Sequence, residues 1–372
     1  MRIALDIVPA QHSVDSGYGR YMYALTSALI DATKEKNEHH FLVILGKNGN
    51  ESLIPRASNV EIAHCKAANQ NVNQQWYAAS IARKWKADLL HNMGAPASML
   101  WNGKLILTIH DIASVRFPKL FPKRWSLFQK YAYIYLKKKN PIVVTVSEFS
   151  KQEIAGHYHY SLERIRVVYP IPGLQPRSVS SEEIFAVRIK YKLPEKYFLY
   201  LGVIEPRKNL VHLVQAFEEY YAFTQTETSL VIAGKIGWHA KELQEVIAKS
   251  PVKQRIVLPG YIDDTDLAAM LASAHAFVYP SLYEGFGYPP LEALMVNTPV
   301  LTSNCASLPE AVGNAGLLVD PLDVHVLAQG LYKIDTDATL RTQLITNGEK
   351  HRTNFTPENS ARKILALYDE MR

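Results

Sequence analysis

The sequence predicts an α/β protein built from two doubly wound domains with parallel sheets. Short β-rich apolar runs alternate with helical patterns almost throughout the chain, which is typical of βαβ units. The length of 372 residues favours two domains. A Pro- and Gly-containing stretch, Tyr169–Gly173, divides the chain, and residues 1–172 carry a net charge of +10 whereas the remainder carries −4. We therefore expect domains at 1–172 and 173–355.

In the first half, runs that predict strands alternate with helical spacing, as in a parallel sheet. Ser150, followed three residues later by Glu153, predicts a helix start near residue 150. The predicted strands are Arg2–Val8, Phe41–Leu45, Leu105–Ile109 and Ile142–Val146, and the predicted helices are Tyr21–Ile30 and Gln74–Lys86.

The second half repeats this alternation after a polar stretch at Gln175–Glu183 that continues the linker. Asp263 is the expected cap of a helix that starts near Asp266. The final segment, Thr356–Met371, is helical in pattern. The other elements are strands at Tyr197–Gly202, Ser229–Ala233, Arg255–Leu258, Ala276–Tyr279 and Pro299–Leu301, and helices at Leu210–Tyr221, Ala240–Lys249, Asp266–Ser273, Leu291–Val296 and Val324–Leu331.

The composition is that of an ordinary globular chain, with 48% hydrophobic and 20% charged residues. Two cysteines, Cys65 and Cys305, offer neither a disulfide framework nor metal-ligand spacing, so we expect a reducing compartment. The sequence contains no apolar run of the roughly 18 to 20 residues that span a bilayer. Asp6 interrupts the first apolar run, which argues against a signal peptide. These observations predict a cytoplasmic protein.

The most informative stretch is Ser281–Glu292, in which Glu284 and Glu292 enclose a glycine- and proline-rich turn. Gly285 and Gly287 allow backbone amides to approach a ligand, and the following helix start adds partial positive charge. Such a turn attracts phosphate, whereas carboxylates repel it and accept from neutral hydroxyls. The stretch therefore indicates a nucleotide sugar, with Glu284 toward the sugar and Glu292 toward the ribose. Alternatively, Glu292 only complements the dipole of its helix.

This stretch resembles the signature of two glutamates eight residues apart in retaining glycosyltransferases of family 4. The similarity continues through Asn297–Asn304 and Ser307–Glu310. The resemblance implies the GT-B fold, two Rossmann-like domains facing a central cleft, with the last helix (356–372) packing back on the first domain. It also places Gly285, Phe286 and Gly287 at the donor.

A second motif, Gly202–Leu210, follows the first strand of the second domain and contains Arg207 and Lys208. A turn between a strand and a helix start is where phosphate sites form, and both side chains could neutralise a diphosphate. Adjacent basic residues on a loop are also commonly just solvated. Family 4 enzymes use such a pair on the diphosphate, although many also carry a basic residue where this chain has Val203.

Five further segments end or follow predicted strands, where ligand crevices open in α/β sheets. Alone, these residues are more often structural than functional, and Ser150 is the favoured cap beside Ser147. The resemblance assigns His110, in Leu107–Asp111, to the donor sugar, and Gly17 and Gly19, in the glycine-rich turn Ser13–Arg20, to the donor phosphate. It further indicates Lys235, Tyr261 and Ile262 as donor-binding residues and Tyr18, Arg20 and Ser147 as acceptor-binding candidates.

The resemblance implies a retaining hexosyltransferase, and the pattern around His110 and Glu284 is most similar to bacterial mannosyltransferases that use GDP-mannose. A rhamnosyl- or glucosyltransferase, a sugar-nucleotide epimerase of the same fold, or a non-catalytic nucleotide-sugar-binding protein remain alternatives. The basic first domain suits a lipid-linked saccharide acceptor in surface polysaccharide or lipopolysaccharide assembly. No cofactor and no metal are expected, because Arg207, Lys208 and helix termini can stabilise the leaving diphosphate.

The segment Phe117–Asn140 mixes basic and aromatic residues at helical spacing. This pattern suits a helix on the inner face of the plasma membrane. It suits equally an ordinary amphipathic helix with solvated lysines. The sequence contains no recognised nucleic-acid-binding module, so we expect no nucleic acid as partner.

Overall fold

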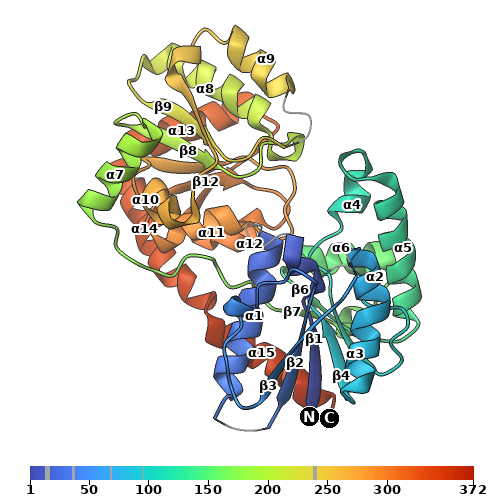
Figure 1. Cartoon of the computed structure of the whole chain (residues 1–372). Helices are drawn as coiled ribbons and strands as arrows, with labels where there is room; N and C mark the ends of the chain where they lie inside the picture. Colours follow the sequence, from blue (N-terminus) through green and yellow to red (C-terminus); the bar gives the residue numbers. More distant parts are fainter. Residues whose placement is uncertain (13–16, 36–37, 68, 95, 238–240) are drawn as a thin grey trace. The chain divides into compact units, whose positions relative to one another are not determined.

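The computed structural model describes residues 1–12, 17–35, 38–67, 69–94, 96–237 and 241–372 (Figure 1). The chain forms two compact units. Unit 1 comprises Met1–Gly173 together with Phe355–Arg372, and unit 2 comprises Leu174–Asn354. The chain therefore leaves unit 1 after residue 173 and returns to it for its last helix.

Unit 1 is a seven-stranded parallel sheet in the order β3-β2-β1-β4-β5-β6-β7. The order reverses between β1 and β4, which makes their carboxyl ends the switch point of this sheet. Its strands are β1 Arg2–Asp6, β2 His40–Leu45, β3 Val60–His64, β4 Leu89–Asn92, β5 Lys104–Thr108, β6 Ile142–Thr145 and β7 Ile165–Val167. Its helices are α1 Gly17–Thr33, α2 Gln70–Val72, the π-helical η3 Asn73–Tyr77, α3 Ala78–Lys84, α4 Ala113–Arg116, α5 Lys123–Lys137, α6 Glu148–Tyr158 and α15 Pro357–Glu370.

Unit 2 repeats the design with a six-stranded parallel sheet in the order β10-β9-β8-β11-β12-β13, and its switch point lies between β8 and β11. Its strands are β8 Tyr197–Leu201, β9 Ser229–Ala233, β10 Ile256–Gly260, β11 Ala276–Tyr279, β12 Val300–Ser303 and β13 Gly316–Val319. Its helices are α7 Ser181–Tyr191, α8 Leu210–Thr224, α9 Lys241–Lys249, α10 Leu267–Ala272, α11 Tyr288–Met295, α12 Leu308–Val312, α13 Val324–Thr336 and α14 Ala338–His351.

The predicted α/β class with two doubly wound domains is confirmed. The sequence patterns missed β3, β4, β7 and β13. β4 ends on the polar His91 and Asn92, which are buried, and β7 is only three residues long. β3 contains the polar Glu61 and His64 among its five residues and pairs only with β2 in the described sheet. Strands that are this short or this polar lack the continuous apolar run that predicts a buried strand.

Two predicted helix caps and one predicted linker were wrong. Ser147, not Ser150, caps α6, because its side chain accepts a hydrogen bond from the amide of Ser150. The Asp263 side chain makes no cap bond and instead accepts from Lys190 Nζ at 2.6 Å. The predicted linker contains the start of α7, where Ser180 and Glu183 form a capping box.

The last helix, α15, packs against α1 in unit 1 (Figure 1). Its Tyr368 is fully buried, with its hydroxyl 2.7 Å from Nδ1 of the buried His91. Burial lowers the pKa of His91 to about 3, so this imidazole is neutral under ordinary conditions. Among the described residues, no helix combines the length and the apolar character needed to cross a bilayer.

Candidate active site

Two loops meet at the switch point of unit 2. The loop after β8 forms a 3₁₀ turn at Pro206–Lys208, and the loop after β11 leads into the glycine-rich turn before α11. The carbonyl of Arg207 accepts from the amide of Leu282 at 2.9 Å and from Ser281 Oγ at 3.2 Å. Backbone contacts thus bring the two predicted motifs, distant in sequence, into one site.

Glu284 is the centre of this site. Its Oε1 accepts hydrogen bonds from Lys208 Nζ at 2.6 Å, Ser281 Oγ at 2.7 Å and Tyr279 Oη at 3.1 Å. Its Oε2 accepts from an Arg207 Nη at 3.0 Å. Burial alone raises the pKa of Glu284, but Arg207 and Lys208 outweigh burial and hold the pKa at about 2. The buried carboxylate is therefore ionised over the whole physiological range.

Arg207 joins Glu284 to a second carboxylate, Glu205. Oε1 of Glu205 accepts from Nε of Arg207 at 3.1 Å and from an Nη at 2.7 Å. The remaining Nη also donates to the carbonyl of Tyr283. Two cations, Arg207 and Lys208, thus face two carboxylates, Glu205 and Glu284, which gives a charge-balanced group that we call the Glu284 network. The sequence indicated both cations as diphosphate ligands, and the structure adds that both hold Glu284.

The turn between the two signature glutamates is held by Ser307. Its hydroxyl bonds the carbonyls of Glu284 at 2.9 Å and Phe286 at 2.7 Å. Gly287 has φ +118°, and a Cβ there would lie 2.9 Å from Leu308 Cδ2, so only glycine fits without strain. The start of α11 at Tyr288 is earlier than predicted, which places the buried Glu292 in the second turn rather than the first.

The loop after β9 contacts the loops after β8 and β10. A Cβ on Gly234, which has φ +134°, would lie 1.9 Å from the carbonyl oxygen of Gly202. The ammonium of Lys235 lies 4.4 Å from the ring centre of Tyr261, and Ile262 is buried. The structure therefore brings the predicted donor residues Lys235 and Tyr261 into contact with each other.

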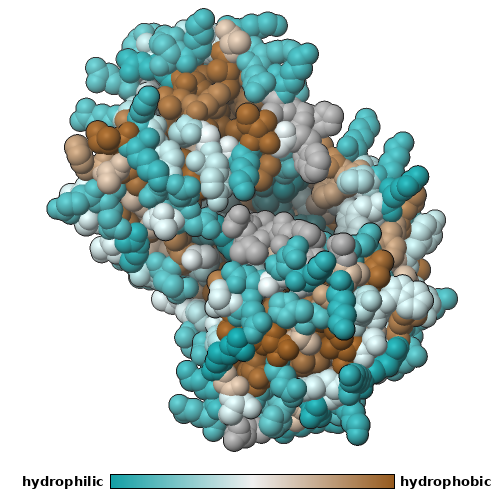
Figure 2. Space-filling view, viewed as in Figure 1, coloured by the Kyte–Doolittle hydropathy of each residue, from teal (hydrophilic) through white to brown (hydrophobic). Residues whose placement is uncertain are grey.

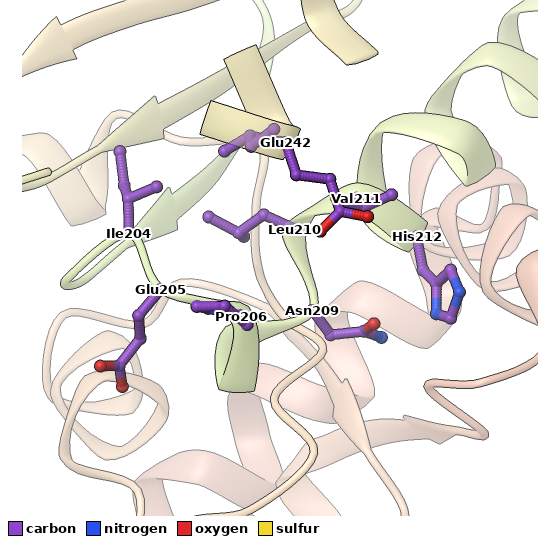
Figure 3. Close-up of a pocket in the computed structure, with 9 residues that line it drawn as sticks. Ile204, Glu205, Pro206, Asn209, Leu210, Val211, His212 and Glu242 are labelled. Atoms are coloured by element: carbon purple, nitrogen blue, oxygen red, sulfur yellow. The ribbon is translucent and has the colours of Figure 1, made fainter. Parts of the chain in front are cut away.

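A pocket of about 200 Å³ lies beside the Glu284 network (Figure 3). Glu205 belongs to both. The other lining residues come from the loop after β8, the start of α8 and α9, and Figure 3 shows Glu242 extending from α9 toward the start of α8. They are Ile204, Pro206, Asn209, Leu210, Val211, His212, Glu242 and Leu243.

In unit 1, the predicted residues His110 and Tyr18 lie at the switch point between β1 and β4. His110 Nε2 lies 3.1 Å from the carbonyl oxygen of Met93, and the His110 ring contacts Tyr18 and Tyr21 at centroid distances of 4.9 and 4.6 Å. Burial lowers the pKa of His110. The neutral imidazole therefore predominates at pH 7.

The glycine-rich turn predicted at 13–20 is largely helix where it is described. α1 begins at Gly17, so Gly17, Gly19 and Arg20 belong to its first turn, and residues 13–16 lie outside the described residues. Ser147 lies at the end of β6, where it is buried as the cap of α6. Acceptor binding by Ser147 stays a prediction.

Sequence reasoning missed Glu205, Tyr279, Ser281 and Ser307. Glu205 stands two residues before Arg207 within the quoted motif, and that spacing was the available signal. Tyr279 and Ser281 sit at a strand end, where polar groups reach a switch point. Nothing in the local pattern around Ser307 indicates its two long-range bonds.

The sequence contains two Asp-x-Asp pairs, Asp264/Asp266 and Asp335/Asp337, and the structure shows other partners for three of these carboxylates. Asp266 accepts from Lys190 Nζ at 2.6 Å. Asp335 accepts from Tyr220 Oη at 2.8 Å and pairs with Lys196 at 2.7 Å, and Asp337 caps α14. Within the described residues, no three His, Cys, Asp or Glu side chains form a group that could hold a metal ion.

Comparisons with known proteins identify the family of this chain. Residues 16–171 match the model of "Glycosyltransferase Family 4", and residues 182–351 match that of "Glycosyl transferases group 1". The O-antigen chain mannosyltransferase B of Escherichia coli is 33% identical over 266 residues, which cover 71% of this chain and 70% of that protein. The chain belongs to glycosyltransferase family 4.

A further relative and a solved structure are also similar to this family 4 glycosyltransferase. The serotype-specific mannosyltransferase WbdA of Escherichia coli is 27% identical over 69% of this chain, which spans only 32% of WbdA. The structure of HepE from Anabaena in complex with UDP and glucose superposes with a TM-score of 0.74 at 18% identity, covering 99% of both chains. This structural similarity confirms the GT-B fold.

Proposed function

We propose that this glycosyltransferase transfers a mannosyl group from GDP-mannose to a saccharide acceptor in the assembly of a bacterial surface polysaccharide, with retention at the anomeric carbon. The Glu284 network carries the proposal. It combines an ionised carboxylate, which can accept hydrogen bonds from sugar hydroxyls, with two cations suited to a diphosphate. The choice of mannose is supported by the relatives, which include an O-antigen chain mannosyltransferase and WbdA.

The proposed chemistry is electrostatic. The bond between the anomeric carbon and the diphosphate oxygen breaks, and a new bond forms to the acceptor oxygen on the same face. Lys208 and Arg207 stabilise the charge that develops on the diphosphate, together with the N-terminus of α8. The acceptor proton passes to the leaving diphosphate, so no protein base is required. The role of His110 is to lie against the reacting sugar as a neutral imidazole.

Glu284 orients the donor sugar in this mechanism. A carboxylate with a pKa of about 2 does not act as a proton donor at neutral pH, but it accepts hydrogen bonds from sugar hydroxyls. Its four protein donors keep it in one position before the donor arrives. Because Glu284 is already held in place, its side chain does not have to move during transfer. The mechanism requires neither a metal ion nor a resident cofactor.

A donor panel tests the proposal. The purified protein is incubated with radiolabelled GDP-mannose, UDP-glucose and dTDP-rhamnose, a manno-oligosaccharide acceptor and EDTA. We expect transfer from GDP-mannose, with the α-anomer retained in the product by NMR. If UDP-glucose is the only donor that supports transfer, the mannosyl assignment is refuted. UDP-glucose is the donor bound in a crystal structure of HepE. Isomerisation of the donor without transfer would instead indicate an epimerase.

We also propose that the acceptor is lipid-linked and that α5 contacts the membrane surface. α5 lies within the basic-aromatic segment 117–140 and exposes a stripe of apolar residues among its lysines. Figure 2 shows hydrophobic surface along the side of unit 1 where Figure 1 places α5. The exposed residues of the stripe are Leu127, Tyr131, Ile134 and Tyr135. We expect the protein to co-sediment with anionic vesicles but not with neutral ones. Equal binding to both would contradict an attraction between the lysines of α5 and an anionic membrane surface.

A further inference from the structure

The helix that follows β3 changes its winding in the middle. α2 passes into a π-helical turn, Asn73–Tyr77, before α3 continues as an ordinary helix. π-helical turns are rare and frequently mark functional sites. This turn leaves a large aromatic side chain in solvent, because Trp76 is 64% exposed beside Val72 at 39% and Tyr77 at 36%. The opposite face supplies Ala78, Ala79 and Ala82 to the core, so packing does not require the tryptophan.

The backbone that carries Trp76 is fixed by its two glutamine neighbours. Gln74 is 1% exposed, and its amide donates to the carbonyl of Gly94 at 3.0 Å. Gln75 donates to the carbonyl of Ala97 at 3.2 Å and accepts from the amide of Met99 at 3.0 Å. A rigid backbone with an exposed indole is a pre-organised contact surface, since little entropy is lost when a ligand covers it.

This turn is connected to the switch point of unit 1. The Gly94 that Gln74 holds follows Met93, whose carbonyl oxygen lies 3.1 Å from His110 Nε2. A Cβ on Gly94 would lie 2.2 Å from the hydroxyl of Tyr18, so the Tyr18 side chain rests on this glycine. The contacts therefore run from the π-helical turn through Gly94 and Tyr18 to His110, all within unit 1.

The segment 69–82 contains no charged residue and is rich in side-chain amides. Asn69 and Asn71 are exposed, and Gln70 is half-buried. Side-chain amides donate to and accept from hydroxyl groups, and an exposed indole offers an apolar face with one N–H donor. A neutral, hydroxyl-rich molecule with apolar C–H faces complements this surface. An anionic membrane does not, in contrast to α5 with its lysines.

We propose that Trp76, flanked by Val72, Tyr77 and the surrounding amides, is a saccharide-binding platform that stacks on a sugar ring of the acceptor. The platform rests on the proposed function, because it supplies unit 1 with the site for that acceptor. The contacts through Gly94 and Tyr18 connect the turn that carries Trp76 to the switch point of unit 1. Trp76 binds the acceptor and takes no part in bond breaking.

The test compares Trp76→Ala with Trp76→Phe and with the control Phe185→Ala. Phe185 lies on α7 in unit 2 and is 67% exposed, which matches the exposure of Trp76. The probe is a panel of α-linked manno-oligosaccharides, followed by intrinsic tryptophan fluorescence and by transfer kinetics. We expect Trp76→Ala to raise the acceptor Kd and KM about tenfold, with the donor KM unchanged. Trp76→Phe should recover most of the affinity, and Phe185→Ala should behave as wild type.

Each outcome separates the platform from the proposed function. Equal acceptor constants for wild type and Trp76→Ala overturn the platform while mannosyl transfer stands. Wild-type protein that transfers mannose but shows no saturable fluorescence change with any saccharide also overturns it. Loss of vesicle binding in Trp76→Ala, with acceptor constants unchanged, assigns the turn to a membrane instead. Circular dichroism verifies the fold of each variant, and donor binding by calorimetry reports separately on the proposed function.

Discussion

At the residue scale, the Glu284 network predicts a large loss of activity from a nearly isosteric change. Glu284→Gln retains the size of the side chain but removes the charge that Lys208 and Arg207 face. We expect kcat/KM to fall by about 100-fold or more, because the amide neither orients a sugar hydroxyl as strongly nor holds both cations in place. Radiolabelled transfer assays measure this fall.

The matched control is Glu245→Gln on α9. Glu245 is exposed and pairs only loosely with Lys241, at 3.6 Å, so its loss should change neither activity nor stability measurably. A Glu284→Gln enzyme with more than a tenth of wild-type activity would be incompatible with the role given to Glu284.

Glu205 gives a second, smaller prediction at this scale. It holds the guanidinium of Arg207 through two donors and so fixes the direction in which Arg207 approaches Glu284. Glu205→Gln should reduce kcat/KM for the donor about tenfold, the cost of weakening one charge-assisted pair. The acceptor KM should remain constant because the acceptor lies elsewhere. If the acceptor KM rises in parallel with the donor KM, Glu205 is a general structural residue rather than one that positions Arg207.

At the element scale, the close approach of the loops after β8 and β9 restricts one position to glycine. Gly234→Ala would place a methyl group 1.9 Å from the carbonyl oxygen of Gly202, at a φ of +134°. We expect destabilisation of about 3 kcal/mol or more and a matching loss of donor binding. Thermal and chemical unfolding measure the effect.

The control at this scale is Gly156→Ala in the middle of α6. A Cβ there meets nothing within 4 Å, and alanine is the better helix former by about 0.5 to 1 kcal/mol. Gly156→Ala should therefore leave the midpoint unchanged or raise it. A similar loss in both variants would show that backbone crowding at Gly234 is not the cause.

The same scale shows what the sequence could predict. The strands β8, β9 and β11 were found within one residue at each end, because their apolar runs are bounded by turn residues. β4 could not be found, since His91 and Asn92 are buried polar residues whose partners come from distant elements. Likewise the pattern favoured Ser150 as the cap of α6, and only the hydrogen bond between Ser147 Oγ and the amide of Ser150 shows that Ser147 is the cap.

The candidate site divides in the same way. Arg207, Lys208 and Glu284 were predicted because they stand in motifs, and the structure brings them into contact. Glu205, Tyr279 and Ser307 were not, because each owes its position to a long-range contact. A sequence motif shows which residues belong together along the chain. A hydrogen-bond network such as that of Glu284 depends on which strand-end loops meet at the switch point.

At the scale of the whole molecule, the two units should respond differently to acid. Burial lowers the pKa of several histidines in unit 1, His91 to about 3, so the unfolded chain binds protons that the folded unit does not. These histidines do not reduce the free energy of unfolding above pH 6.5, the ordinary pKa of histidine. As the pH falls below 6.5, the unfolded chain takes up protons and the free energy of unfolding decreases. The other histidines are His39, His110 and His157.

One buried carboxyl in unit 1 opposes this trend. Burial raises the pKa of Asp6 to about 6, so its uptake of a proton favours the folded state as the pH falls from 6 to 3.8. A single carboxyl offsets only part of the effect of several histidines. In unit 2, burial lowers the pKa of the single histidine His351, against four such histidines in unit 1. Carboxylates of unit 2 with lowered pKa, such as Glu284 and Asp335, keep their contribution until the pH falls below about 4. Unit 1 should therefore lose stability first on acidification.

Hydrogen exchange resolved along the chain checks this order. Protection in the strands of unit 1 should fall between pH 7 and pH 5, while the strands of unit 2 keep theirs. An equal decline in both units would contradict the assignment to the buried histidines.

The balance of two cations and two carboxylates in the Glu284 network has a kinetic consequence. A group of net charge zero exerts little field beyond a Debye length of about 8 Å, so it does not attract a nucleotide diphosphate from bulk solvent. Recognition begins only at contact, when phosphate oxygens compete with carboxylates for the same donors. The association rate of the donor should therefore hardly change with ionic strength, and a stopped-flow series from 20 mM to 500 mM salt would reveal steering if it existed.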